Sequence, residues 1–426
     1  MARPAGEVRF LLFTEAQETL TAFARTEDAA QWDVWVRSED RAVRARIDRG
    51  VEDSIGNLIL YGTSFTQLPR VEAAESAITP SGELIAAARA RVHAAAALLA
   101  HPVENERLRF ARDFLLRHNV KPGDMETLLA ANLVRFALEQ RGYREKLKSI
   151  PQSADPGEAR LVRATLFEHR GLSVDTSLLP NFALEDTLRA MLRKGALAPG
   201  SIRRIAVIGP GLDFTDKRDG YDFYPVQTIQ PFAIMEAVTR LGLGKADELR
   251  VTACDLNPAV IAHLKGMAER ARAGHPYILQ LPRMKAADWT PESIAYWSHF
   301  GETIGSPVAP VAAPEGLILR AVSVQPKYAA TVEPLDLNVV GQVVDQPAGS
   351  GFDLVVATNI LVYYDRFQQA LAMAGIARMM NSGGVFLSNT VLPAQRPSLL
   401  EYLGRRSVKY SVSGAYGDDV VVYRRR

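Results

Sequence analysis

In the first 172 residues, the hydrophobic and polar positions mostly follow a helical pattern. Residues 81–120 are rich in Ala, Leu, Arg and Glu, and Pro102 is expected to divide them into two helices. Apolar side chains in residues 124–149 lie close to a spacing of three or four positions, at Leu128, Leu129, Leu133, Phe136 and Leu138. This spacing is typical of an amphipathic helix. The pattern predicts an N-terminal all-α domain over residues 1–172.

A different pattern begins after the polar segment 151–158, which we interpret as a turn or linker. Short apolar runs predict strands, and they lie at residues 202–209, 249–255, 352–359 and 383–389. Helical stretches follow these runs, at residues 230–242, 257–273 and 365–381. Strands that alternate with helices form a parallel sheet that is buried on both faces. Residues 173–426 are therefore expected to form a doubly wound, Rossmann-like α/β domain.

Two regions of this second domain depart from simple alternation. The runs 405–412 and 418–425 flank the turn-forming segment 413–417, which predicts an antiparallel strand pair at the C-terminus. Residues 276–350 are interpreted as an insertion before the next sheet strand. Within it we expect a helix, a Pro/Ala-rich loop and one or two strands, over residues 290–305, 307–316 and 317–338 respectively.

Composition and charge narrow the classes of function. The 426 residues are 47% hydrophobic, enough for two cores, and 50 basic residues balance 48 acidic ones. This balance argues against a nucleic acid or an anionic membrane as the main partner. Cys254 is the single cysteine, which excludes an internal disulfide and a cysteine-based metal site. No signal peptide or long apolar stretch is found, so we expect a cytoplasmic protein without a membrane span. No paired-histidine or carboxylate motif suggests a metal site.

The segment "RRIAVIGPGLDFTDK" at residues 203–217 combines an apolar run with a glycine pair. Gly209 and Gly211 lack a Cβ, so the backbone at a strand end could approach a bound nucleotide-type ligand closely. An isolated pair of this kind also fits a plain turn between a strand and a helix. A third glycine is expected two positions after Gly211, and Asp213 stands there instead.

The next predicted strand ends at Asp255, where a carboxylate could accept both ribose hydroxyls of an adenosine. The alternative is that Asp255 only caps the helix that follows. Asp255 follows Gly211 by 44 positions, whereas a dinucleotide site uses about 20. The surplus lies in the connection 212–230, which is expected to act as a lid. In it, Tyr221 and Tyr224 either cover a ligand or pack internally.

The segment "FDLVVATNILVYYD" at residues 352–365 resembles class I S-adenosylmethionine-dependent methyltransferases. Its strand ends in Asn359, and an apolar-aromatic run and an Asp follow, most similar to the chemotaxis-receptor methyltransferases. The segments "VEPLDLN" and "MMNSGGVFLSNTV" resemble the same families. The resemblance covers residues 200–426 in order and leaves the N-terminal region unexplained.

The resemblance implies S-adenosylmethionine as the cofactor and assigns positions to its binding site. It implies that Gly209 and Gly211 line the methionine and ribose, that Asp255 holds the ribose, and that Leu256 lies against the adenine. It further places Asp336 and Leu337 at the adenine amino edge, and Asn359 and Ile360 near the transferred methyl group. Val207 and Asp213 depart from the family pattern, which carries an acidic residue at the first position and a glycine at the second. The cofactor's amino group would then be held differently, with Asp213 as the candidate.

The sequence leaves the acceptor and the catalytic base open. Methyl transfer depends mainly on positioning and the exclusion of water, and a base is needed only for some acceptors. Candidate bases are Tyr221, Tyr224, Tyr363, Asp213 and His299. The acceptor is expected to be a small molecule or a protein carboxylate, and the N-terminal helices are expected to serve acceptor selection or homodimer formation. The alternatives are an NAD(P)-dependent oxidoreductase and a non-catalytic, methyltransferase-like interaction protein. The long glycine-to-Asp spacing, the missing third glycine and the antiparallel strand pair argue against the oxidoreductase.

Overall fold

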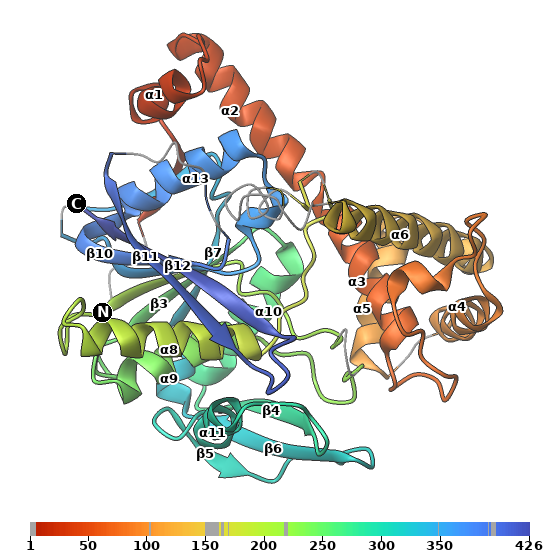
Figure 1. The fold of residues 1–426 in the computed structure, drawn as a ribbon. Coiled ribbons are helices and arrows are strands. Elements are labelled where there is room, and N and C mark those ends of the chain that lie inside the picture. The colour runs from red at the N-terminus through yellow and green to blue at the C-terminus, as the bar shows by residue number, and fades with distance from the viewer. Residues whose placement is uncertain are drawn as a thin grey trace.

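The computed structural model describes residues 6–101, 104–149, 162, 166–168, 170–216, 220–347, 349–390, 392 and 398–426. A central sheet has helices on both faces, and a group of N-terminal helices lies beside it (Figure 1). A smaller sheet lies on another side of the molecule. The chain therefore has a mixed α/β fold with a mostly parallel central sheet.

The central sheet has seven strands in the order β11-β12-β10-β9-β2-β3-β7. The strands are β2 Arg204–Ile208, β3 Arg250–Asp255, β7 Val332–Asp336, β9 Phe352–Ala357, β10 Met380–Ser388, β11 Leu400–Lys409 and β12 Gly417–Arg425. Strands β2, β3, β7, β9 and β10 run parallel, and β12 runs antiparallel between β10 and β11. The chain order reverses at β2, and such a switch point leaves a crevice at the carboxyl ends of the strands.

The apolar alternation of the central strands explains why both faces of the sheet are covered. On β2, Ile205 and Val207 join one core cluster, whereas Ala206 and Ile208 join another on the opposite face. One face is covered by α8 Leu179–Arg193, α9 Gln230–Arg240 and α10 Pro258–Arg272. The other face is covered by α13 Arg366–Met379, against which α1 Phe13–Ala22 and α2 Ala29–Arg44 pack. The helices predicted at 230–242, 257–273 and 365–381 are thus confirmed.

The N-terminal helical group forms one wall of the crevice. It contains α3 Ile47–Tyr61, α4 Ala86–Leu99, α5 Glu106–Arg117 and α6 Met125–Lys148, with the short 3-10 helices η1 Ala74–Ala77 and η2 Pro122–Asp124. Helix α6 confirms the helix predicted at 124–149, although Leu138 is 46% exposed and does not belong to its buried face. Helices α4 and α5 are separate, as predicted. Pro102, expected to divide them, lies outside the described residues, as does the segment 151–158.

The N-terminal region is not purely helical, which corrects the all-α prediction. Strand β1 Glu7–Phe10 pairs antiparallel with β8 Gln342–Asp345, more than 300 positions away in sequence. The following residue, Leu11, is 2% exposed and belongs to the same core cluster as α13. This apolar run is too short to identify from its own sequence, because its partner strand is so distant.

The insertion predicted at 276–350 contains the smaller sheet, and part of it belongs to the central sheet. The smaller sheet has the order β4-β6-β5, with β4 Tyr277–Met284, β5 Gly305–Val308 and β6 Leu317–Val324. Helix α11 Pro291–His299 confirms the predicted helix, and the short helix α12 Pro326–Ala329 leads into β7. Strand β4 was not predicted, and Pro307 and Val308 lie in β5 rather than in a loop. Strand β7 is an edge strand of the central sheet, so the insertion ends before it.

The glycine pair after β2 is needed for close packing within the protein itself. Gly211 has a φ of +61°, and a Cβ built on it would lie 2.6 Å from the carbonyl oxygen of Val174. Gly211→Ala is therefore expected to lower the free energy of unfolding by about 3–4 kcal/mol, because φ strain of about 1–2 kcal/mol adds to the overlap. Gly242→Ala is the control, because Gly242 has a φ of +67° but no atom near the added Cβ. It should cost only about 1 kcal/mol in urea unfolding; equal losses for the two variants would contradict the packing role.

Candidate functional site

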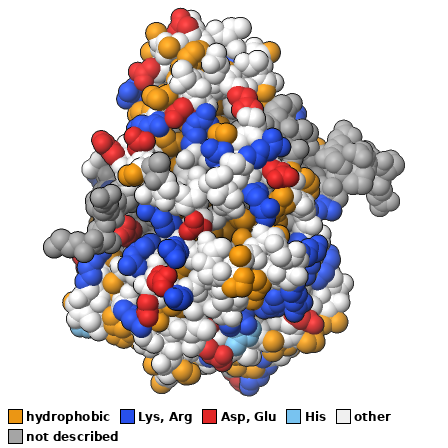
Figure 2. All heavy atoms as spheres, turned by 90° about the vertical axis from the view of Figure 1, so that its left-hand side faces the viewer, with side chains coloured by type: hydrophobic (Ala, Val, Ile, Leu, Met, Phe, Trp, Pro, Cys, Tyr) orange, Lys and Arg blue, Asp and Glu red, His pale blue; other side chains and the backbone are white. Residues whose placement is uncertain are grey.

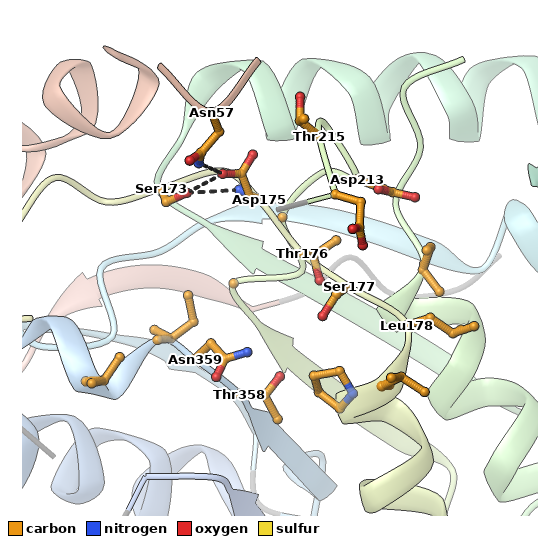
Figure 3. Close-up of a pocket in the computed structure, with 18 of the residues that line it drawn as sticks. Asn57, Ser173, Asp175, Thr176, Ser177, Leu178, Asp213, Thr215, Thr358 and Asn359 are labelled. Atoms are coloured by element: carbon orange, nitrogen blue, oxygen red, sulfur yellow. Dashed lines mark hydrogen bonds between the residues drawn. The ribbon is translucent and has the colours of Figure 1, made fainter. Parts of the chain in front are cut away.

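A cavity of about 820 Å³ lies at the carboxyl ends of the central strands. Its walls come from the ends of β2, β3 and β9, from helices α3 and α6, from the smaller sheet, and from the turn between β11 and β12. Figure 3 shows part of this cavity, with Asn57 of α3 pointing toward Asp175, and with Thr358 and Asn359 at the end of β9 on the other side of the segment 173–178. Cofactor and substrate sites typically occupy about 300–1,000 Å³. The cavity therefore has room for a cofactor and a small acceptor together.

Most of the site residues that the sequence predicts meet at this cavity. The lining includes Gly209, Gly211, Asp213, Asp255, Leu256, Leu337, Asn359 and Ile360, together with the three tyrosine candidates Tyr221, Tyr224 and Tyr363. Asp336 does not line the cavity, and its carboxylate pairs with Arg44 at 2.8 Å. His299 does not line it either; it packs against Tyr296 at the end of α11.

Asp255 is held at the end of β3 by backbone groups. Its Oδ1 accepts a hydrogen bond from the backbone N–H of Asn257 at 2.8 Å. Burial raises the pKa of Asp255 to about 6, although backbone hydrogen bonds from Asn257, Gly211 and Leu256 favour the carboxylate. The N-cap of α10 is Asn257, whose side chain accepts from the N–H of Ala259 at 2.9 Å. Asp255 is thus not the helix cap, and its carboxylate faces the cavity.

Asp213 lies in a buried polar network rather than at an open turn. Its Oδ2 accepts hydrogen bonds from the Tyr224 hydroxyl at 2.9 Å and from Gln227 Nε2 at 2.8 Å. Burial raises the pKa of Asp213 to about 6. Burial and the Asp213 carboxylate together raise the pKa of Tyr224 well above 10, so this phenol keeps its proton. Tyr224 is therefore a poor candidate for a base.

We expect the Asp213 carboxyl to make folding stability depend on pH. Its folded pKa of about 6 exceeds the ordinary value of about 3.9, so between these values the folded chain binds more protons than the unfolded chain. Its contribution to the free energy of unfolding therefore falls as pH rises from about 4 to about 6. Asp213→Asn removes this titration, so the variant should be more stable than the wild type by about 2–3 kcal/mol at pH 8. Urea unfolding should show this advantage shrinking toward pH 4; an advantage that is independent of pH would contradict the assignment.

The described parts of the connection, residues 212–216 and 220–230, are tied to the N-terminal helices and form one wall of the cavity. The role of this connection as a lid stays a prediction. Arg107 on α5 is 2% exposed and donates to the carbonyl oxygens of Asp213, Phe214 and Tyr224. Asp222 is also buried, and its carboxylate accepts from the backbone N–H groups of Thr63 and Ser64 at 3.0 and 2.9 Å. Tyr221 and Tyr224 are both buried within this wall.

The segment 173–178 lines the cavity and was not recognised as part of the site from the sequence. It runs beside the glycine turn, because the N–H of Leu212 donates to the Val174 carbonyl at 2.7 Å and the N–H of Thr176 donates to the Leu212 carbonyl at 3.0 Å. The Asp175 carboxylate accepts from Asn57 Nδ2 at 2.7 Å and from the Ser173 hydroxyl at 3.0 Å (Figure 3). The run of Ser, Asp and Thr residues before α8 is the sequence feature that could have indicated its place in the site.

The N-terminal helices contribute an aromatic wall around a buried cation. Arg170 lines the cavity, and its Nε lies 3.1 Å from Asp53 Oδ2. The guanidinium carbon lies 5.4 Å from the ring centroid of Phe136 and 5.3 Å from that of Phe167. The Phe167 ring in turn lies 6.2 Å from that of Tyr363, which follows β9 in the 3-10 helix η3 Leu361–Tyr363. The helical region thus completes the cavity, although no local motif indicated this.

Charge and metal-ligand patterns add little to the site. Basic and acidic side chains lie interspersed over the face shown in Figure 2. Within the described part of the chain, no group of three or more His, Cys, Asp or Glu side chains is arranged to hold a metal ion. None of the helices described here is both long enough and apolar enough to cross a bilayer.

Comparison with known proteins gives distant structural neighbours only. No family model matches the sequence, and no curated protein matches it. Solved structures similar to this chain include the N-methyltransferase NodS from Bradyrhizobium japonicum WM9, with 12% identity over 57% of this chain and 97% of that one, at a TM-score of 0.28. Magnesium protoporphyrin IX methyltransferase (ChlM) from Synechocystis PCC 6803, solved with bound SAM, is 9% identical to this chain. The match covers 68% of this chain and 97% of that one, at a TM-score of 0.28. The glycopeptide N-methyltransferase MtfA is 10% identical over 59% of this chain and 93% of that one, also at a TM-score of 0.28. These three neighbours are methyltransferases.

Proposed function

We propose that this protein is an S-adenosylmethionine-dependent methyltransferase whose cofactor binds in the cavity at the strand ends. The observation that carries the proposal is the meeting of three features there. The glycine turn after β2, the Asp255 carboxylate after β3 and Asn359 after β9 all line one cavity. These strands are adjacent in the sheet, with β2 between β3 and β9. A ligand that spans their ends would contact all three.

The residues present fit an adenosyl cofactor that carries positive charge. Asp255 is suited to accept the ribose hydroxyls, and Leu256 and Leu337 offer apolar surface for the adenine. The cofactor's ammonium group requires a carboxylate near the glycine turn. Val207 on β2 cannot supply one, because valine has no carboxylate and this side chain is buried in the core. Asp175 and Asp213 both line the cavity beside the turn and would take that role.

For methyl transfer, the main task of the protein is to position the cofactor and the acceptor relative to each other. The bound cofactor supplies an activated methyl group, so the barrier is lowered chiefly by alignment and by keeping water out. Residues 212–216 and 220–230 provide one wall, which Arg107 and Asp222 tie to the N-terminal helices. The helices α3 and α6 close the opposite side with aromatic side chains. Asn359, with a φ of +59°, holds a left-handed backbone conformation at the end of β9, as is common at functional sites.

A thermal-shift panel tests this function. A ligand that binds only the native state raises the melting temperature, so S-adenosylhomocysteine should stabilise the protein and NAD should not. Stabilisation by NAD alone would favour an oxidoreductase. No shift with either ligand would favour a non-catalytic interaction protein.

A further inference from the structure

A line of hydrogen-bonded polar side chains runs along the strand ends toward the C-terminal strand pair. The backbone N–H of Asn359 donates to Asn389 Oδ1 at 2.8 Å, and Asn389 Nδ2 donates back to Asn359 Oδ1 at 2.7 Å. Asn389 Nδ2 also contacts Asp418 Oδ1 at 3.4 Å, and the Tyr410 hydroxyl donates to Asp418 Oδ2. The line therefore ends in a carboxylate that donors hold on two sides.

Asp418 faces the cavity from the start of β12, whereas its neighbour faces away. Asp418 lines the cavity, as do Asn359 and Tyr410. Asp419 pairs instead with Arg405 at 3.1 Å and with Ser407 on the neighbouring strand. Successive side chains of a strand point to opposite sides, which explains the difference. The two aspartates thus offer a matched pair, one directed at the site and one outside it.

The charges of the cavity lining as a whole, together with the Asp418 carboxylate, favour a basic acceptor group. Among the described residues, no Lys, Arg or His forms an ion pair with Asp418. The cavity lining that the structure describes contains seven carboxylates, Glu72, Glu75, Asp175, Asp213, Asp216, Asp255 and Asp418, against the guanidinium groups of Arg170 and Arg283. An acceptor that carries a carboxylate would meet like charge at Asp418. An amine would gain an ion pair there.

Aromatic side chains line the cavity near the turn that precedes Asp418. Trp289, Tyr410 and Tyr416 line the cavity. They lie together, because the N–H of Tyr410 donates to the Tyr416 carbonyl at 2.9 Å and Trp289 forms a bridge with Ser411. Aromatic faces attract cations and also bury an apolar body. The surroundings therefore fit a protonated amine that is attached to an aromatic or apolar group.

We propose that the methyl acceptor is such an amine and that Asp418 binds it and takes its proton. This inference rests on the proposed methyltransferase function. The bound ammonium first gives one proton to the Asp418 carboxylate, which leaves a lone pair on nitrogen. The neutral nitrogen then forms a bond to the methyl carbon while the bond between carbon and sulfur breaks. That electron pair stays on sulfur, so the products are S-adenosylhomocysteine and a methylated ammonium ion. Burial raises the pKa of Asp418, which makes this carboxylate a better proton acceptor than an exposed one.

The test compares three probes that share a phenyl body and differ in the nucleophile: phenethylamine, 4-ethylphenol and 3-phenylpropanoic acid. Each is titrated calorimetrically into the full-length protein saturated with S-adenosylhomocysteine. We expect the amine to bind at least tenfold more tightly than the other two probes. Asp418→Asn should weaken amine binding at least tenfold, whereas the matched control Asp419→Asn should leave it unchanged. With S-adenosylmethionine in place of its product, only the amine should yield S-adenosylhomocysteine, and Asp418→Asn should slow that reaction.

Several results would overturn the inference while leaving the proposed function in place. These are tighter binding of the phenol or the acid, no binding of the amine, and equal amine binding by the wild type and Asp418→Asn. Calorimetry with S-adenosylhomocysteine alone separates the two claims. If wild type and Asp418→Asn bind it equally, the cofactor site is intact, and any loss belongs to the acceptor. If neither binds it, the proposed function itself fails.

Discussion

Replacing Arg107 by methionine is expected to lower the free energy of unfolding by about 3–5 kcal/mol. The side chain is 2% exposed and donates to the carbonyl oxygens of Asp213, Phe214 and Tyr224. Methionine keeps much of the volume but leaves those buried carbonyls without their donor, and each such group costs about 1–3 kcal/mol. The residues of the cavity wall that carry these carbonyls should therefore open more readily. Urea unfolding measures the loss, and faster amide hydrogen exchange in residues 212–216 and 220–230 should locate it.

The control for this prediction is Arg109→Met on the same helix. Arg109 is exposed, and its guanidinium contacts the Glu104 carbonyl at 2.9 Å near the surface. Surface substitutions of this kind usually change stability by less than about 0.5 kcal/mol. If Arg107→Met proved no more destabilising than Arg109→Met, the hydrogen bonds from Arg107 to the three carbonyl oxygens would not stabilise the fold as we propose.

Replacing Asp255 by alanine is expected to weaken S-adenosylhomocysteine binding by at least about 100-fold. The proposed ribose contacts are two hydrogen bonds to one carboxylate, and a hydrogen bond to a charged group contributes about 1.5–3 kcal/mol. Calorimetric titration should show the loss, and the melting temperature of the variant should no longer respond to the ligand. Circular dichroism of the variant checks that the loss is not one of folding.

Asp336→Ala provides a sharp comparison, because the family resemblance and the structure disagree about this residue. The resemblance implies that it lies at the adenine edge, whereas its carboxylate pairs with Arg44 outside the cavity lining. We therefore expect the dissociation constant of Asp336→Ala for S-adenosylhomocysteine to lie within about twofold of the wild-type value. This corresponds to a change in binding free energy of about 0.4 kcal/mol or less. A loss comparable to that of Asp255→Ala would restore Asp336 to the site.

The central sheet was predictable because its physical signals are local. Val207 and its neighbours on β2 form an apolar run that only a buried strand explains, and Asn257-Pro258 marks the start of α10. By contrast, β1 was missed because its four residues have no strong pattern, and their partner β8 is distant in sequence. Strand β4 was missed for a related reason, since it pairs with β6 across a helix and a Pro/Ala-rich loop.

The candidate site was predictable at the strand ends and unpredictable at the cavity walls. Gly209, Asp255 and Asn359 stand where parallel strands end, so their meeting follows from the sheet alone. Asn57, Asp175 and Asp418 come from elements that pack over the strand ends from elsewhere in the sequence. Their positions depend on tertiary packing, which leaves no periodic signal. At Gly211 a side chain is excluded by the protein itself, because a Cβ there would lie 2.6 Å from the Val174 carbonyl oxygen. A glycine at this position therefore does not by itself indicate a bound ligand.

A crystal structure of the protein with S-adenosylhomocysteine tests the central claim most directly. We predict that the ribose hydroxyls contact the Asp255 carboxylate, that the adenine lies between Leu256 and Leu337, and that the amino-acid end reaches the segment 173–178. The sulfur should face Asn359. A ligand bound elsewhere, or strand ends filled by the protein's own side chains at saturating ligand, would contradict the assignment of this cavity and the methyltransferase function with it.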